Sequence, residues 1–153
     1  LVEQVPYLSD DLRALIAGLS PERLHTPYRP GGWTIRQIVH HMADNDLNAY
    51  LRFKRALTEE EPTASSYRED LWGELSDYLE VPVDNSVQLL RLLHIRFVVL
   101  LRRMQPAQFA RTLRTEALGR VTLDVALQRF VWHNRHHLAQ IRSTIAAKGW
   151  QVR

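Results

Sequence analysis

Apolar residues recur at intervals of three and four along four long segments of the chain, which is the period of one face of an α-helix. No segment of useful length alternates between apolar and polar residues as a half-buried strand would. The pattern therefore predicts an all-α fold. The apolar positions of the four segments are Leu8, Leu12, Leu15, Ile16 and Leu19; Ile38, Met42, Ala49 and Phe53; Val87, Leu90, His94, Phe97, Leu101 and Met104; and Leu123, Ala126, Phe130, His133, His137, Ile141 and Ile145.

Capping signals indicate where these helices begin and end. Thr34 precedes Gln37 by three residues, a capping-box spacing, and predicts a second helix that runs to about residue 57. Ser66 and Glu69 repeat this spacing and predict a shorter helix carrying Leu71, Trp72, Leu75 and Leu79. The third helix follows residues 84–86, and the fourth runs from Thr122 to a basic last turn at residues 148–149. Prolines and glycines predict a loop over residues 26–32, and the polar stretch 110–120 is expected to be irregular. We expect a single domain over residues 1–153, an antiparallel four-helix bundle with a short additional helix.

The composition fits this picture and excludes several kinds of site. The 153 residues are 45% hydrophobic and 24% charged, which suits one compact domain. The absence of cysteine excludes a disulfide framework, a thiolate zinc site, an iron–sulfur cluster and a cysteine nucleophile. Metal chemistry must therefore use histidine and carboxylate ligands, or a thiol supplied by another molecule.

The charge and hydropathy of the chain do not point to a macromolecular partner. Twenty basic and seventeen acidic residues give a net charge of +3, and the arginines are scattered among acids rather than gathered in one stretch. We expect no nucleic-acid partner. No segment approaches the roughly 18 uninterrupted apolar residues of a membrane span, and no signal peptide opens the chain, so the cytoplasm is the expected compartment.

The histidines are the most informative polar residues. Six of the seven lie on three of the four predicted helices. His133 and His137 are four residues apart and continue the apolar positions of the fourth helix, so both rings face the core. An unpaired buried polar group costs roughly 1–3 kcal/mol, so these rings need partners. A metal ion would supply them, although two core histidines satisfied by protein groups would show the same spacing.

The second helix offers a third donor. His41 borders the apolar face, whereas His40 points about 100° away and is expected to be exposed. His136 is the weaker candidate of its cluster, and His25 is expected at the surface. His41, His133 and His137 would form a three-nitrogen site with an open position, as in catalytic metal centres. Zinc (Zn²⁺) fits such a site well, and nickel, iron or manganese are alternatives.

Other polar residues lie close to these candidates in the sequence. Asp44 is the nearest carboxylate to a proposed ligand and is a candidate base or a residue that orients a ligand, although a solvated acid is the simpler interpretation. Asn45 and Asn48 could hold substrate. His94 is either a core histidine or a residue that supports the site.

Two stretches of the chain resemble signature segments of a known family. Residues 30–44 (PGGWTIRQIVHHMAD) and 131–141 (VWHNRHHLAQI), with shorter likenesses at 50–54 (YLRFK) and 57–59 (LTE), resemble the YfiT-type branch of the DinB-like superfamily. The resemblance implies a four-helix bundle, often a homodimer, with one divalent metal ion per chain, most simply Zn²⁺ or Ni²⁺. It assigns the metal ligands to His41, His133 and His137. Compared with that branch, we expect the chain to lack the relatives' N-terminal extension, and it carries Arg114-Thr115 where relatives tend to have His-Pro.

The resemblance implies a metal-dependent enzyme but leaves its class open. The first hypothesis is transfer of a low-molecular-weight thiol of the bacillithiol type to an electrophile, since metals deprotonate coordinated thiols. The second is hydrolysis by a metal-bound water, which the absence of a glutamate within one turn of the histidines disfavours. The third is a binding module that uses the metal only for stability.

Overall fold

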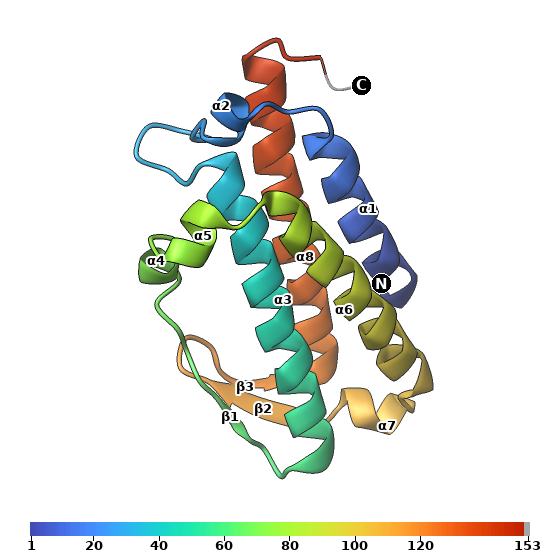
Figure 1. Cartoon of the computed structure of the whole chain (residues 1–153). Coiled ribbons are helices and arrows are strands. Elements are labelled where there is room, and N and C mark those ends of the chain that lie inside the picture. The colour runs from blue at the N-terminus through green and yellow to red at the C-terminus, as the bar shows by residue number, and fades with distance from the viewer. Residues whose placement is uncertain (152–153) are drawn as a thin grey trace.

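Four long helices form the body of the protein in a computed structural model, which describes residues 1–151 (Figure 1). They are α1 (Val5–Ile16), α3 (Ile35–Thr58), α6 (Val83–Arg103) and α8 (Leu123–Ala147). The four-helix bundle expected from the sequence is confirmed. Within residues 1–151 no helix is long and apolar enough to span a bilayer. A 3-10 turn, η1 (Val2–Gln4), precedes α1, and short helical turns lie between the long helices: α2 (Pro21–Leu24), α4 (Glu69–Trp72), α5 (Ser76–Glu80) and α7 (Pro106–Phe109).

The long helices run in two directions. α1 and α8 point one way along the bundle, and α3 and α6 point the other way (Figure 1). Each of α3 and α1 packs against both α6 and α8. The consecutive helices α3 and α6 are parallel because the connection 59–82 returns along the length of the bundle (Figure 1). The pair α3 and α8, which carries the candidate ligands, is antiparallel.

The predicted ends of α3 and α8 agree with the structure. The Thr34 hydroxyl accepts a hydrogen bond from the Gln37 backbone N–H at 3.1 Å, and the Gln37 side-chain oxygen accepts from the Thr34 N–H at 2.9 Å. This reciprocal pair is the expected capping box. α8 starts directly after Thr122 and is followed by Gly149 at φ 65°, a conformation that glycine adopts without strain.

The structure contains strands, which the sequence analysis did not predict. β1 (Thr63–Ala64) pairs parallel to β2 (Thr112–Thr115), and β2 forms an antiparallel hairpin with β3 (Gly119–Thr122). The expectation that 110–120 is irregular was therefore wrong. Each strand has at most four residues, and Leu113 is the only buried residue of β2, so no alternating pattern was long enough to detect. The sheet covers one end of α3 and α8 (Figure 1).

The short helix predicted from Ser66 and Glu69 is also different in the structure. Two single turns, α4 and α5, replace it, and no side chain caps α4. The leucines expected on its apolar face, Leu71, Leu75 and Leu79, are exposed. Contacts from α3 hold the segment instead: the Arg36 guanidinium donates to the backbone carbonyls of Tyr78, Leu79 and Val81 at 2.7, 2.7 and 2.6 Å.

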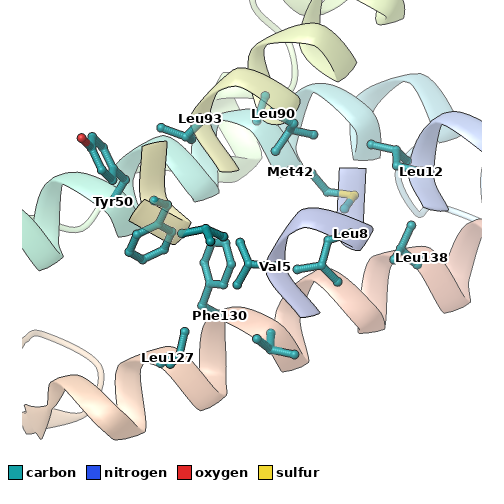
Figure 2. Close-up of a cluster of buried hydrophobic side chains, with 14 of the residues drawn as sticks. Val5, Leu8, Leu12, Met42, Tyr50, Leu90, Leu93, Leu127, Phe130 and Leu138 are labelled. Atoms are coloured by element: carbon teal, nitrogen blue, oxygen red, sulfur yellow. The ribbon is translucent and has the colours of Figure 1, made fainter. Parts of the chain in front are cut away.

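The core lies between the four long helices. Apolar side chains from all four, including Leu8, Met42, Leu90 and Leu138, meet in its centre (Figure 2). Phe97 is fully buried at the end nearer the sheet, where its ring packs edge-on against Tyr50, Phe53 and Phe130 with centroid separations of 5.7, 4.9 and 5.2 Å. Edge-to-face pairs of this kind add to the free energy gained by burial. This packing fixes α3 against α8 and thereby positions the site between them.

Candidate metal centre

Three imidazole rings meet between α3 and α8. His41 comes from α3, and His133 and His137 come from consecutive turns of α8. Nε2 of His133 lies 3.2 Å from Nε2 of His41 and 3.1 Å from Nε2 of His137. One nitrogen from each ring therefore faces a common point, and all three lie within 4.8 Å of one another. The structure brings together the three residues that helical spacing selected.

These separations suit a divalent ion. A tetrahedral ion with metal–nitrogen distances of about 2.05 Å needs nitrogens about 3.3 Å apart, close to the observed 3.1 and 3.2 Å. A metal ion at the common point would contact all three nitrogens at once, which a hydrogen bond between two of the rings does not. Among residues 1–151 no carboxylate joins this cluster. His41, His133 and His137 therefore fit a metal bound by three nitrogens with an open position.

The rings are neutral at physiological pH, as metal ligands must be. Burial, followed by the neighbouring imidazoles His137 and His133, lowers the pKa of His41 to about 2. Burial is also the main cause that lowers the pKa of His133, to about 3, and the pKa of His137.

The groups behind the rings differ between the three histidines. Gln140 lies one turn beyond His137 on α8, and its side-chain oxygen accepts from Nδ1 of His137 at 2.7 Å, which leaves Nε2 free to bind. The side-chain amide nitrogen of Asn45 lies 3.1 Å from Nδ1 of His133. Nδ1 of His41 is buried without a hydrogen-bond partner in the described chain. The Trp33 ring packs on His41 with a centroid separation of 4.5 Å and shields the cluster from water.

The other histidines lie outside the cluster. His40 is buried, contrary to the expectation that it is exposed: its Nδ1 contacts the Ser86 hydroxyl at 2.8 Å, and its ring packs near Tyr78. The crossover connection covers this face of α3, and periodicity alone could not reveal that. His136 is exposed and stacks on Trp132, and His25 is exposed near α2, as expected.

Asp44, Asn45 and Asn48, which the sequence analysis placed near the metal site, have different surroundings in the structure. Asp44 does not join the imidazole cluster and accepts a hydrogen bond from the Tyr78 hydroxyl at 2.6 Å, so its role as a base stays a prediction. Burial raises the pKa of Asp44. Asn48 donates to the backbone carbonyl of Asp44 at 2.9 Å and does not line the cavity described below. Asn45 does line this cavity.

His94 belongs to a buried polar network that the sequence analysis did not identify. Its Nε2 lies 2.7 Å from a carboxylate oxygen of Asp46, and the other Asp46 oxygen accepts from the Asn134 amide at 2.8 Å. All three side chains are fully or almost fully buried. The sequence did contain one sign of this network. Asp46 lies one turn after Met42 on the apolar face of the helix, where a charged side chain needs buried partners. The network links α3, α6 and α8, and the Asn45 amide, which contacts His133, also lies 3.4 Å from Asp46.

A cavity of about 440 Å³ opens beside His133, between α3 and α8 and under the sheet. Its volume falls within the range of small-molecule sites. Asn45 and His133 lie at the imidazole end, and apolar side chains, Phe53, Leu113, Val121 and Phe130, form much of the remaining wall. Arg52, Tyr67, Glu69 and Arg129 add polar groups. The imidazole cluster therefore faces a space that can hold a substrate.

Comparison with known proteins places this centre in a family. The model of the DinB superfamily matches residues 7–141, which include all three histidines. The chain belongs to the DinB superfamily. This confirms the family that the sequence resembles.

Individual members of the DinB superfamily resemble the whole chain. A Geobacillus kaustophilus protein and a Geobacillus thermodenitrificans protein are each 44% identical; they cover 94% and 97% of this chain, and the chain covers 81% and 84% of them. Both are named "Putative metal-dependent hydrolase". The structure of YfiT from Bacillus subtilis, described as "a probable metal-dependent hydrolase with an unusual four-helix bundle topology", matches with a TM-score of 0.95 and 38% identity, covering 98% of this chain and 86% of that one. These names support a metal-dependent enzyme and leave its reaction and its metal open.

Proposed function

We propose that this chain is a metal-dependent transferase that joins a low-molecular-weight thiol of the bacillithiol type to a small electrophile. The observation that carries the proposal is the cluster of three neutral imidazoles, without a carboxylate, at the end of a cavity. A divalent ion held by His41, His133 and His137, Zn²⁺ or Ni²⁺, would supply Lewis acidity that lowers the pKa of a coordinated thiol or water.

The surrounding residues prepare the site for this chemistry. Gln140 keeps the proton of His137 on Nδ1, so that Nε2 faces the common point. A half-turn of the Asn45 carboxamide would give His133 the same support, because its oxygen would then face Nδ1. Trp33 excludes water from one side of the cluster, and the cavity leaves the other side open to reactants.

Thiol transfer suits this arrangement better than hydrolysis does. Activation of water for attack on an ester or amide commonly uses a carboxylate base near the metal. Here Asp44 is bound by Tyr78 and Asp46 by His94 and Asn134, and Glu69, the one carboxylate of the cavity lining, lies outside the imidazole cluster. A thiol needs no such base, because metal coordination itself deprotonates it. Hydrolysis is the second candidate, favoured by the names of the relatives.

One set of assays separates these functions. Protein loaded with zinc, nickel or manganese is incubated with bacillithiol and a chromogenic electrophile, and separately with activated esters. Conjugation that requires the thiol and is lost in His133→Ala is the expected result. Conjugation that persists in this variant and after chelation would refute the metal mechanism. Ester cleavage without conjugation would favour hydrolysis, and activity in neither assay, with a melting temperature lowered by chelation, would favour a binding module.

We further propose that the chain forms a homodimer, as the family resemblance implies. A row of exposed apolar side chains on α6, Leu89, Leu92, Ile95 and Val99, supports this proposal. Exposed apolar patches of this kind often mark interfaces between proteins. Light scattering should give twice the chain mass for the wild type and a smaller value for Leu92→Glu. A wild-type monomer at micromolar concentration would refute the proposal.

A further inference from the structure

Two arginines line the cavity beside His133 without a carboxylate partner. Seven of the seventeen arginines within residues 1–151 form ion pairs with Asp or Glu, and Arg52 and Arg129 are the two arginines without one that line this cavity. Arg52 donates one N–H to the backbone carbonyl of Ser65 at 2.9 Å, which holds the side chain in place and leaves its other donors free. A guanidinium group carries five N–H donors and matches a carboxylate with two parallel hydrogen bonds.

The cavity also contains one buried hydroxyl without a partner in the described chain. It belongs to Tyr67, which lines the cavity. Burial raises the pKa of Tyr67, so this hydroxyl stays protonated. Glu69 is the one carboxylate of the lining; Glu69 and Arg129 are exposed at the rim, whereas Arg52 is half-buried. An acceptor on the ligand would satisfy the Tyr67 hydroxyl, and a negative charge would match the two arginines.

The two arginines lie on the same side of the imidazole cluster. Arg129 precedes His133 by one turn of α8, about 6 Å along the helix axis, and Arg52 follows Asn45 by two turns of α3, about 10 Å. Because α3 and α8 run antiparallel (Figure 1), both displacements point toward the sheet. A ligand whose sulfur reaches the imidazoles could therefore extend along the cavity to both guanidinium groups.

We propose that this cavity selects an acidic thiol, one that carries a carboxylate, and that Arg52 and Arg129 bind that carboxylate. The inference rests on the proposed thiol transfer, since the molecule held beside His133 is then the thiol. The apolar wall formed by Leu113, Val121 and Phe130 contacts the carbon skeleton between the two ends. Arg52 and Arg129 thereby determine specificity without contacting the reacting sulfur.

Calorimetric titration of the metal-loaded protein tests this inference without any turnover. The probes are S-methyl bacillithiol, in which the methyl group blocks transfer, and the same compound with its carboxylates converted to methyl esters. The acid should bind at least about tenfold more tightly than the ester. Arg52→Gln and Arg129→Gln should each weaken binding of the acid by about tenfold or more and leave binding of the ester unchanged. Arg142→Gln, an exposed arginine of α8 outside the cavity, is the matched control and should change neither.

Two results would overturn the inference: equal binding of acid and ester, or unchanged binding of the acid in both cavity variants. Arg129→Lys should recover part of the affinity, because lysine keeps the charge and loses the paired geometry. Binding that depends on the arginines, in a protein that shows no conjugation, would refute thiol transfer and retain an acidic ligand. Conjugation together with binding that does not depend on the arginines would retain thiol transfer and refute selection of an acidic thiol by Arg52 and Arg129. The failure of the proposed function and the failure of this inference therefore give different results.

Discussion

Replacement of Gln140 should weaken metal binding although Gln140 is not a proposed ligand. Its side-chain oxygen accepts the Nδ1 proton of His137 at 2.7 Å, and His137 is only 7% exposed, so water can replace this contact poorly. In Gln140→Ala the buried N–H loses its partner, at a cost of about 1–3 kcal/mol, and the ring is free to rotate away. Loss of such a supporting contact typically lowers metal affinity about 10- to 100-fold. Gln140→Glu keeps the acceptor and adds negative charge, so it should retain or increase the affinity.

The assay is competition with a chromogenic chelator at fixed pH, measured for zinc and for nickel. Gln128→Ala is the matched control, because Gln128 is an exposed glutamine on the same helix. Circular dichroism should show unchanged helix content in all three variants. Equal affinity in Gln140→Ala and wild type, or an affinity as low in Gln140→Glu as in Gln140→Ala, would refute the role assigned to this residue.

Three further predictions concern stability. Phe97→Ala should destabilise the fold by about 3–5 kcal/mol in urea unfolding, because it empties the centre of the aromatic cluster; a loss below about 1 kcal/mol would contradict this packing. Tyr78→Phe removes the hydroxyl that donates to Asp44 and should cost about 1–3 kcal/mol at neutral pH. Burial raises the folded-state pKa of Asp44, so ionising this carboxylate costs stability; the cost is complete above the folded pKa, declines as the pH falls through it and is gone below the unfolded pKa. The loss of unfolding free energy caused by Tyr78→Phe should therefore be smaller in acid than at neutral pH. An equal loss at acid and neutral pH would contradict the assigned hydrogen bond to an ionised Asp44. Finally, added zinc or nickel should raise the melting temperature of the wild type in proportion to the logarithm of metal concentration, and His133→Ala should abolish this rise; a similar rise in both proteins would show that the ion binds elsewhere.

The parts of the site that follow from local spacing were predictable from the sequence. His133 and His137 share a helix face because they are four residues apart, and His41 borders the apolar face that packs on α8. The Thr34 capping box is equally local. These features require only the period of a helix and the rule that its apolar face is buried.

The features that sequence reasoning missed depend on contacts between distant segments. Tyr78 reaches Asp44 from the crossover connection, 34 residues away, and the same connection buries His40. Arg52 and Arg129 share a cavity only because two helices and a sheet enclose it. The strands are too short to show a period. Helical periodicity carries no information about which distant segment covers a given face.

Metal content per chain tests the central claim most directly. Purified protein, loaded with zinc or nickel and freed of excess ion, should contain one ion per chain by elemental analysis. His41→Ala, His133→Ala and His137→Ala should each lose most of it, whereas His136→Ala, which changes an exposed histidine outside the cluster, should retain it. A wild type that holds no ion under any loading condition, or a His133→Ala variant that still holds one ion per chain, would contradict the account of this centre.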